Sequence, residues 1–344
     1  MDYKKEYQKW LASAIVDEAT KNELMSLDEE EIKFRFISYL AFGTGGLRGT
    51  MVAGTNAMNV YTVAHATQGF ANLILKEGRA DDGVVIAYDS RNNSPLFART
   101  AASVLAANGI GVYLFDALRP TPELSFALRF LKCVAGINIT ASHNPKAYNG
   151  YKAYWEDGAQ LPPEHAAVVS EEIGKLDIFN DIKTVDVDTA IADGRIRMIS
   201  EEIDEAYLRE VQAQAINPEA IRAVADDLHI VYTPLHGAGY RLVPEILARC
   251  GLKHLHPVVE QLQPNGDFPT VAKPNPEYPA VFKLGIDIAN RVGSDLIIAT
   301  DPDADRIGTM VRTGDTYSTI TGNQMGVLLL DYVIKAKKAT GTLP

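Results

Sequence analysis

The sequence lacks the features that mark secreted, disulfide-stabilised or membrane-spanning proteins. It contains only two cysteines among 344 residues, Cys133 and Cys250, and neither lies in a metal-binding or redox spacing such as Cys-x-x-Cys. No run approaches the roughly 18 apolar residues that a membrane-spanning helix needs. The charged, amphipathic N-terminus has no apolar core of signal-peptide length. We therefore expect a cytoplasmic protein with two buried thiols.

Basic residues are also in the minority. The chain has 33 lysines and arginines against 44 aspartates and glutamates, which gives a formal net charge of −11. A nucleic-acid-binding domain usually carries a basic surface, so we expect no nucleic-acid partner, and no membrane partner either. An acidic protein can still bind an anionic substrate where basic side chains and backbone N–H groups converge. The composition therefore predicts a small positive pocket in a negative protein.

Two successive series of apolar strands and helices organise the chain. The first has strands at 84–89, 111–115 and 134–140 and helices at 94–109 and 121–131. The second has strands at 229–233, 254–259 and 296–300 and helices at 241–251 and 279–293. Each helix ends near a glycine and is followed by an apolar strand, as crossover units require. The pattern predicts an α/β fold with two topologically related mixed-sheet α/β domains that share one cleft.

The domain boundaries follow from these series. We expect a first domain at 1–200, whose first forty residues look helical, and a second domain at 201–318. Residues 319–344 predict a loop and one helix, capped by Asn323 or a neighbour. A single helix cannot bury its apolar face alone. The last segment is therefore expected to be the start of a truncated third domain.

The first series ends in the loop TASHNPKAYNGYKAYWEDGAQL, residues 140–161. Ser142 directly follows an apolar strand and is surrounded by His143, Asn144 and Lys146, with Lys152 ten positions on. A serine hydroxyl is a poor nucleophile unless a base or a positive environment activates it, and these neighbours would suit a phosphate on Ser142. Alone, Ser-His-Asn-Pro could equally be a turn whose side chains cap their own backbone.

The second series ends in the loop DPDADR, residues 301–306. Asp301, Asp303 and Asp305 can converge on one hard cation such as Mg²⁺, and without a cation they would repel one another. An EF-hand is excluded because Arg306 and Arg312 occupy the positions that need glycine and glutamate. A solvated acidic turn is the alternative for Asp-x-Asp alone.

A third motif, GTGGLRG at residues 43–49, is rich in glycine. Its backbone N–H groups could approach an anion closely, and Arg48 could bind phosphate in a bidentate manner. A flexible turn is the alternative. The loops PLHGAGY (234–240) and KPNPEYP (273–279) could serve as a hinge and as a proline-fixed helix entry. For His254 and His256 we expect packing roles, with one facing the core and the other exposed.

Together these motifs resemble the α-D-phosphohexomutase superfamily, and most closely its phosphoglucomutase and phosphopentomutase branch, in which the serine loop continues into Tyr-Asn-Gly-Tyr-Lys and Trp-Glu-Asp-Gly. The resemblance implies that Ser142 carries the phosphoryl group, with His143 beside it, Arg48 nearby and Lys152 as general acid/base. It implies one Mg²⁺ held by Asp301, Asp303, Asp305 and the phosphate on Ser142. The substrate-binding residues that it implies are Thr44, Gly45, Asn144, Lys146 and Arg306.

The reaction implied by the resemblance is that of an isomerase acting on a sugar phosphate. Glucose 1-phosphate would be converted reversibly to glucose 6-phosphate through the phosphoserine and a sugar 1,6-bisphosphate, which also acts as activator. Complete members have four domains, and the third and fourth select the sugar and bind its distal phosphate. We therefore expect the two domains to form only part of a phosphohexomutase cleft, and the truncated chain to be inactive alone.

Other interpretations stay open at this point. The chain could belong to a phosphopentomutase or a sugar-bisphosphate synthase. It could be a haloacid-dehalogenase-like phosphatase with Asp301 as nucleophile, which would leave the Ser142 loop without a role. It could also be a non-catalytic fragment that binds Mg²⁺ and a phosphosugar. The sequence does not indicate an oligomeric state.

Overall fold

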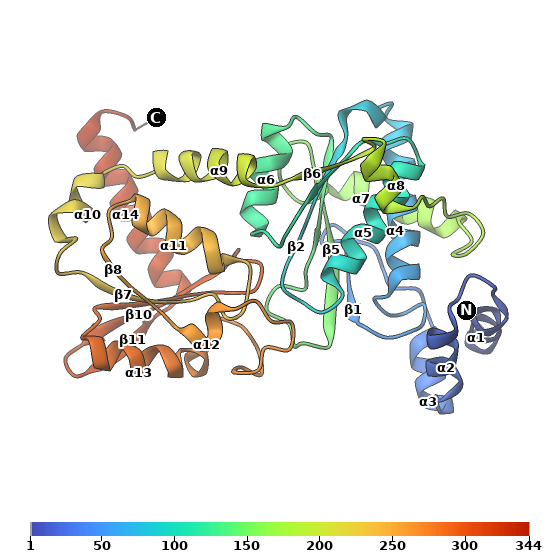
Figure 1. The fold of residues 1–344 in the computed structure, drawn as a ribbon, viewed down its shortest axis with the longest axis horizontal. Helices are drawn as coiled ribbons and strands as arrows, with labels where there is room; N and C mark the ends of the chain where they lie inside the picture. The colour runs from blue at the N-terminus through green and yellow to red at the C-terminus, as the bar shows by residue number, and fades with distance from the viewer. Residues whose placement is uncertain (1, 344) are drawn as a thin grey trace. The chain divides into compact units, whose positions relative to one another are not determined.

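A computed structural model describes residues 2–343 and divides the chain into two compact units, which are treated separately below (Figure 1). The first unit comprises the residues up to Leu118, with Leu124–Ala141 and Ala147–Ile199. The second comprises Ser200 onward together with two short segments, Arg119–Glu123 and Ser142–Lys146. Each unit is built on one mixed sheet, so the predicted α/β fold with two mixed-sheet parts is confirmed.

The first unit contains a six-stranded sheet and its covering helices. Its strands are β1 (Leu47–Thr50), β2 (Val84–Tyr88), β3 (Val112–Phe115), β4 (Ala135–Ile139), β5 (Tyr148–Trp155) and β6 (Ile196–Ile199). Its helices are α1 (Tyr3–Ala12), α2 (Glu18–Met25), α3 (Glu29–Phe36), α4 (Val60–Lys76), the 3₁₀ turn η1 (Ala80–Asp82), α5 (Ser94–Ala107), α6 (Thr121–Phe130, which begins in the segment assigned to the second unit), α7 (Pro163–Lys175) and α8 (Val187–Ala192).

The order of strands in this sheet is β1-β5-β4-β2-β3-β6. Strand β2 pairs in parallel with β3 on one side and β4 on the other, whereas β5 pairs antiparallel with β4 and β1. The chain therefore passes from β2 to β3 on one side of β2 and then crosses to β4 on the other side. Because the strands are parallel, the loops after β2 and β4 emerge at the same edge of the sheet. Open α/β sheets bind ligands at such a switch point.

Helices cover both faces of the sheet, with α6 on one side and α4, α5 and α7 on the other (Figure 1). Strand β2 is a nearly continuous apolar run and every residue of β4 is buried, Asn138 included, because both strands are covered on both faces. Leu124 and Leu128 of α6 pack on β4 at Gly136. The N-terminal helices form a smaller cluster around Trp10, with Phe36 and Phe179 edge-on to its ring.

The second unit contains a five-stranded sheet. Its strands are β7 (His229–Thr233), β8 (His254–Pro257), β9 (Leu296–Thr300), β10 (Ile307–Thr313) and β11 (Thr316–Ile320). Its helices are α9 (Glu201–Ala213), α10 (Pro218–Val224), α11 (Gly239–Arg249), α12 (Val259–Leu262), the 3₁₀ turn η2 (Pro279–Phe282), α13 (Lys283–Val292) and α14 (Gly322–Thr340).

The strand order β11-β10-β9-β7-β8 repeats the arrangement of the first unit. Strand β7 pairs in parallel with β8 and β9, and α11 and α13 lie on opposite sides of the sheet (Figure 1). The switch point again lies between two parallel strands, so the loops after β7 and β9 share one edge. The predicted topological relation between the two parts of the chain is thus confirmed, since β4-β2-β3 corresponds to β9-β7-β8.

Helix α14 differs from the other long helices because none of its 19 residues is buried. It begins with a capping box in which Thr321, two residues before the expected Asn323, caps the helix with Gln324. Its exposed apolar residues include the run 327–330. No helix within residues 2–343 is long and apolar enough to cross a membrane.

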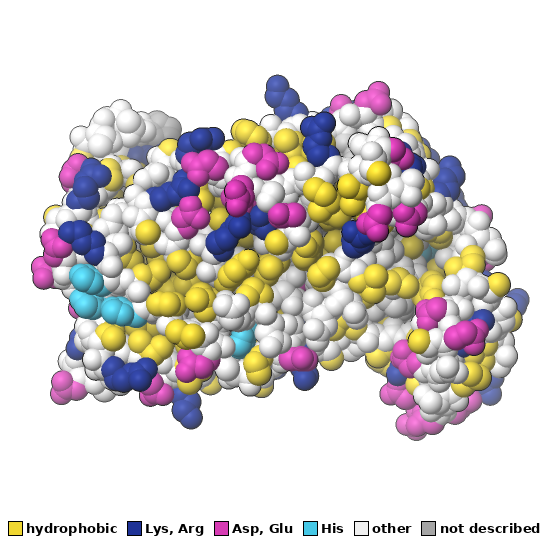
Figure 2. Space-filling view, viewed as in Figure 1, with side chains coloured by type: hydrophobic (Ala, Val, Ile, Leu, Met, Phe, Trp, Pro, Cys, Tyr) yellow, Lys and Arg dark blue, Asp and Glu magenta, His cyan; other side chains and the backbone are white. Residues whose placement is uncertain are grey.

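The histidines of β7 and β8 correct the sequence interpretation. His254 and His256 were expected on opposite faces, but residues two apart in a strand share a face. Both are half-buried, and both rings lie against His229, at centroid distances of 4.4 Å and 5.1 Å. Histidine side chains gather over these strands in Figure 2. Of the two thiols expected to be buried, Cys133 is buried and Cys250 is half-buried.

Candidate functional site

The acidic loop begins at the carboxyl end of β9, where an apolar strand gives way to DPDADR. Asp301 and Asp303 are fully buried, and Asp305 is exposed. One carboxylate oxygen from each lies within 4.8 Å of those of the other two, and among the described residues this is the only group of three or more side chains that could hold a metal ion. Burial, and then the charges of Asp303 and Asp305, raise the pKa of Asp301 well above its usual value. The cluster is therefore electrostatically unfavourable without a cation.

The loop is held in a tight conformation by its own backbone. The Ala304 N–H donates to the Asp301 carbonyl, and Ala304 adopts a left-handed φ of 52°. The Arg306 N–H donates to Asp301 Oδ1 at 3.0 Å. These bonds turn the chain back on itself within four residues, which brings alternate carboxylates to one side.

A second loop, 234–238 after β7, packs directly against the acidic loop. The Ala238 N–H donates to the Pro302 carbonyl at 2.8 Å. A Cβ atom on Gly237 would come within 2.4 Å of the Pro302 Cα, so only glycine permits this approach. Gly237 therefore has a packing role, because it supports the acidic loop, and the hinge expected here stays a prediction.

Ser142 belongs to the second unit and bonds to the acidic cluster. Its hydroxyl donates to Asp301 Oδ2 at 2.6 Å, and its Oγ lies 3.2 Å from His143 Nδ1. Ser142 is almost fully buried and adopts a left-handed φ of 51°. Such a backbone is costly for a residue other than glycine and is often found at functional sites. Ser142, His143 and the three aspartates are thus the predicted residues that the structure brings together.

Three further predicted residues of the second unit have other surroundings. Asn144 is half-buried in the serine loop. Lys146 is exposed, and its Nζ lies 3.5 Å from Asp267 Oδ1 beside a hollow of about 430 Å³. Arg306 Nη1 lies 3.1 Å from Glu277 Oε1. The two basic side chains are therefore paired with carboxylates in this structure.

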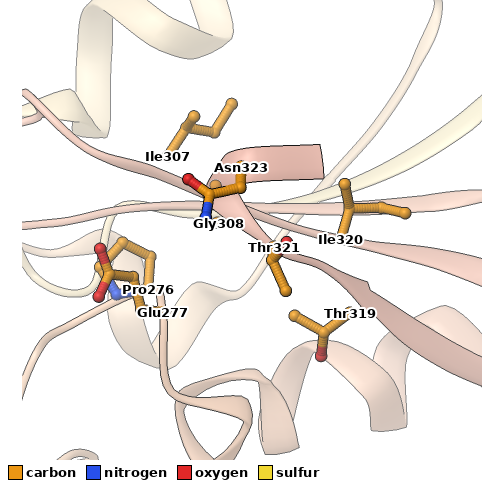
Figure 3. Close-up of a pocket in the computed structure, with 9 residues that line it drawn as sticks. Pro276, Glu277, Ile307, Gly308, Thr319, Ile320, Thr321 and Asn323 are labelled. Atoms are coloured by element: carbon orange, nitrogen blue, oxygen red, sulfur yellow. The ribbon is translucent and has the colours of Figure 1, made fainter. Parts of the chain in front are cut away.

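Glu277 also lines a second hollow, of about 370 Å³, next to the acidic loop. Its walls come from the 276–277 turn, the start of β10, the end of β11 and the first residues of α14. In Figure 3, Pro276 and Glu277 lie on one side of the hollow, Thr319 and Ile320 lie on the other, and Asn323 and Thr321 lie between them. Its lining mixes polar side chains with the apolar side chains of Pro276, Ile307 and Ile320.

The remaining predicted residues belong to the first unit. Thr44 and Gly45 form the exposed tip of a turn closed by two backbone hydrogen bonds between Gly43 and Gly46. Arg48 is exposed on β1. Lys152 is almost fully buried on β5, where its register partner on β4 is Asn138.

The sequence analysis did not identify a buried ion pair at the switch point of the first unit. Asp89, directly after β2, accepts hydrogen bonds from the Arg91 N–H, the Ser94 hydroxyl and the Thr140 hydroxyl. Arg91 Nε lies 3.2 Å from Asp89, and its Nη1 donates to the Tyr148 carbonyl. This network joins the ends of β2, β4 and β5. The only signal in the sequence was a charged Asp-x-Arg directly after an apolar strand.

Comparisons with known proteins point to one family. A family model described as phosphoglucomutase/phosphomannomutase, alpha/beta/alpha domain I, matches residues 39–178, and the domain II model matches residues 205–314. The chain is 41% identical over 322 residues to a phosphoglucomutase of Staphylococcus saprophyticus, covering 93% of this chain and 57% of the relative. It is 42% identical over 299 residues to a phosphoglucomutase of Staphylococcus epidermidis, covering 86% of this chain and 53% of the relative.

The fold is also similar to that of solved structures. A phosphoglucomutase/phosphomannomutase family protein from Burkholderia thailandensis matches with a TM-score of 0.67 at 20% identity, covering 86% of this chain and 58% of that chain. The chain thus spans little more than half the length of the relatives that it matches.

Proposed function

Because the chain belongs to the phosphoglucomutase/phosphomannomutase family, we propose that it carries the phosphoryl-transfer residues of a sugar-phosphate mutase, with Ser142 as the phosphorylated residue. The observation that carries this proposal is the 2.6 Å hydrogen bond from the Ser142 hydroxyl to Asp301 within a cluster of three carboxylates. A phosphate on Ser142 would lie beside these acids, and so much negative charge requires a cation.

The acidic cluster fits Mg²⁺ by the chemistry of its donors. An octahedral Mg²⁺ with oxygens at about 2.1 Å separates them by about 3 to 4 Å, within the 4.8 Å spread of the three carboxylates. Asp301, Asp303 and Asp305 would hold the ion, and an oxygen of the phosphate on Ser142 would complete the site. When bound, the ion would neutralise charge that develops on the transferring group.

The chain's own residues would then carry out two transfers. In the first, the bond between Ser142 Oγ and phosphorus breaks while a sugar hydroxyl oxygen bonds to phosphorus, giving a bisphosphate. The hydroxyl proton passes to Lys152, our candidate base, and His143 Nδ1, 3.2 Å from Ser142 Oγ, returns a proton to the serine. In the second, the bond between the other phosphate and its sugar oxygen breaks while Ser142 Oγ bonds to phosphorus. The Ser142 proton passes back to His143 Nδ1, and Lys152 gives its proton to the sugar oxygen. The sum is an isomerisation.

We propose glucose phosphate as the substrate, since the relatives are named phosphoglucomutase. Arg48, Thr44, Gly45, Asn144, Lys146 and Arg306 would bind it. Lys146 and Arg306 would have to leave Asp267 and Glu277 to do so, which costs little because these ion pairs are partly solvated. Turnover is proposed for a protein of the relatives' length, and little or none for the 344 residues alone.

Phosphoryl loading tests this proposal directly. The purified chain is incubated with Mg²⁺ and glucose 1,6-bisphosphate, and its intact mass and phosphopeptides are then measured. We expect one added phosphoryl group, on Ser142, and none in Ser142→Ala. Ser125→Ala is the matched control, because that serine donates to a backbone carbonyl of the first unit and its loss should leave loading unchanged.

Three results would contradict the proposal. Loading that persists in Ser142→Ala would mean that another group accepts the phosphate. A hydroxylamine-labile phosphate on Asp301 would favour the phosphatase interpretation instead. Binding of the bisphosphate without any transfer, in a protein of the relatives' length, would favour a non-catalytic phosphosugar-binding protein.

A further inference from the structure

Asp303 receives two hydrogen bonds from a residue 182 positions earlier in the chain. The Thr121 N–H donates to the Asp303 carbonyl at 2.8 Å, and the Thr121 hydroxyl donates to Asp303 Oδ2 at 2.8 Å. Both residues are buried. One threonine therefore holds both the backbone and the carboxylate of the central aspartate in the acidic loop.

The segment that presents Thr121 is itself held rigidly. Pro120 and Pro122 flank the threonine and restrict the backbone on both sides. Pro122 is tolerated because it lies in the first turn of α6, where its missing N–H would have no partner in the helix. Arg119 forms a bidentate pair with Asp204 of α9, through Nε at 2.6 Å and Nη2 at 3.1 Å. The donors of Thr121 are thus fixed before any ion binds.

We propose that Thr121 is a positioning residue that orients Asp303 and thereby sets the affinity of the acidic loop for a divalent cation. The inference rests on the metal site proposed above. A hydrogen bond to one carboxylate oxygen limits rotation of the group and stabilises its negative charge. Removing a hydrogen bond that orients a metal ligand typically weakens metal binding by about 10- to 100-fold.

Metal titration of the 344-residue chain tests this role. The dissociation constant for Mn²⁺, used as a probe for Mg²⁺, is measured by calorimetry for the unchanged chain, Thr121→Val and Thr121→Ser. Valine keeps the shape and the backbone N–H but loses the hydroxyl, whereas serine keeps the hydroxyl. We expect Thr121→Val to bind about 10-fold more weakly or worse, and Thr121→Ser to restore most of the affinity.

The matched control is Thr67→Val. Thr67 is a buried threonine of α4 whose hydroxyl donates to the Val63 carbonyl at 2.7 Å, so its substitution removes an equivalent bond in the first unit. We expect its Mn²⁺ affinity to equal that of the unchanged chain. Thermal unfolding without metal shows whether each variant is folded. Should Thr121→Val fail to fold, Thr121→Ala is compared with Thr67→Ala.

The outcomes separate this inference from the proposed function. Unchanged Mn²⁺ affinity in Thr121→Val, even with a lower melting temperature, would overturn it, because the threonine would then be only structural. Weaker binding that Thr121→Ser fails to restore would also overturn it, since the hydroxyl would not be the cause. If the unchanged chain binds no Mn²⁺, the proposed metal site itself is wrong.

Discussion

Glu123 is a carboxyl group that the fold buries completely. Its closest cation is Arg119, whose Nε lies 3.9 Å from Oε2, and neither carboxylate oxygen has a hydrogen-bond partner among the described residues. Desolvation raises the pKa of Glu123 from 4.5 to about 7, although the charges of Arg119 and Arg241 lower it in part. The folded chain therefore favours the protonated form of this residue.

This shift predicts that stability falls as pH rises. A carboxyl group whose pKa is higher in the folded state contributes stability that is fully present below the unfolded pKa, near 4.5, and is lost as pH rises to about 7. The difference amounts to roughly 3 kcal/mol as an upper bound. We expect Glu123→Gln to be increasingly more stable than the unchanged chain between pH 5 and 7.5, measured by urea unfolding.

A control separates this effect from general charge effects. Glu164 is an exposed glutamate of α7, so Glu164→Gln removes the same charge without a buried group. Its pH profile should run parallel to that of the unchanged chain. If Glu123→Gln also runs parallel, Glu123 is ionised in the folded state and its pairing with Arg119 outweighs its burial.

At the scale of single residues, the sequence indicated the chemical groups but not their supports. Ser142 and the three aspartates could be proposed from the sequence because each group lies within one short loop after an apolar strand. Thr121, Gly237 and Asp89 could not, because their roles depend on contacts with residues far away in sequence. A threonine between two prolines and a glycine after a histidine carry no local sign of what they touch.

At the scale of elements, the two crossover series could be predicted, and strand β5 could not. The series alternate apolar strands with helices that end near glycine, which is a strong pattern. Strand β5 (YNGYKAYW) contains Asn149, Gly150 and Lys152. These residues interrupt the apolar pattern by which a buried strand is recognised in a sequence. Its Asn149 side chain donates to the Asn92 carbonyl, and a Cβ on Gly150 would come within 2.5 Å of the Thr140 carbonyl. Polar pairing and close approach, rather than apolar patterning, thus define this strand.

Helix α14 leads to a prediction about stability. Since none of its residues is buried and Leu328 and Leu330 are more than half exposed, replacing these two leucines by glutamate removes little packing. We expect Leu328→Glu/Leu330→Glu to change the free energy of unfolding of the 344-residue chain by no more than about 0.5 kcal/mol per substitution. Ile297→Ala, in the core of the second sheet, should cost about 2 to 5 kcal/mol.

Urea unfolding of the two variants measures the contrast. A loss of more than about 2 kcal/mol in the double glutamate variant would mean that α14 packs on the rest of the chain in solution. The same variant should scatter less light at high concentration than the unchanged chain, because four consecutive apolar residues, 327–330, are exposed.

At the scale of the whole chain, the acidic composition has to be reconciled with the proposed binding of an anion. The net charge of −11 acts weakly at a distance, since the screening length at physiological ionic strength is only about 8 Å. What a phosphate would meet at Ser142 is therefore decided locally. There Asp301 accepts the Ser142 hydrogen bond, His143 Nδ1 lies 3.2 Å from Ser142 Oγ, and Asp301 is clustered with two further carboxylates. A divalent cation is the simplest way to offset most of that local negative charge.

The same electrostatics predict how a metal should change stability. An ion that binds only the folded chain adds about 2.7 kcal/mol at 100 times its dissociation constant. Asp305 is the exposed member of the cluster, and its charge contributes to the raised pKa of Asp301. Asp305→Asn should therefore melt at the same temperature as the unchanged chain or higher without metal, yet gain less from Mn²⁺. Asp315→Asn, at an exposed site outside the loop, should gain as much as the unchanged chain. Thermal unfolding with and without Mn²⁺ measures all three proteins, and an equal metal-induced gain in Asp305→Asn would show that Asp305 is not a ligand.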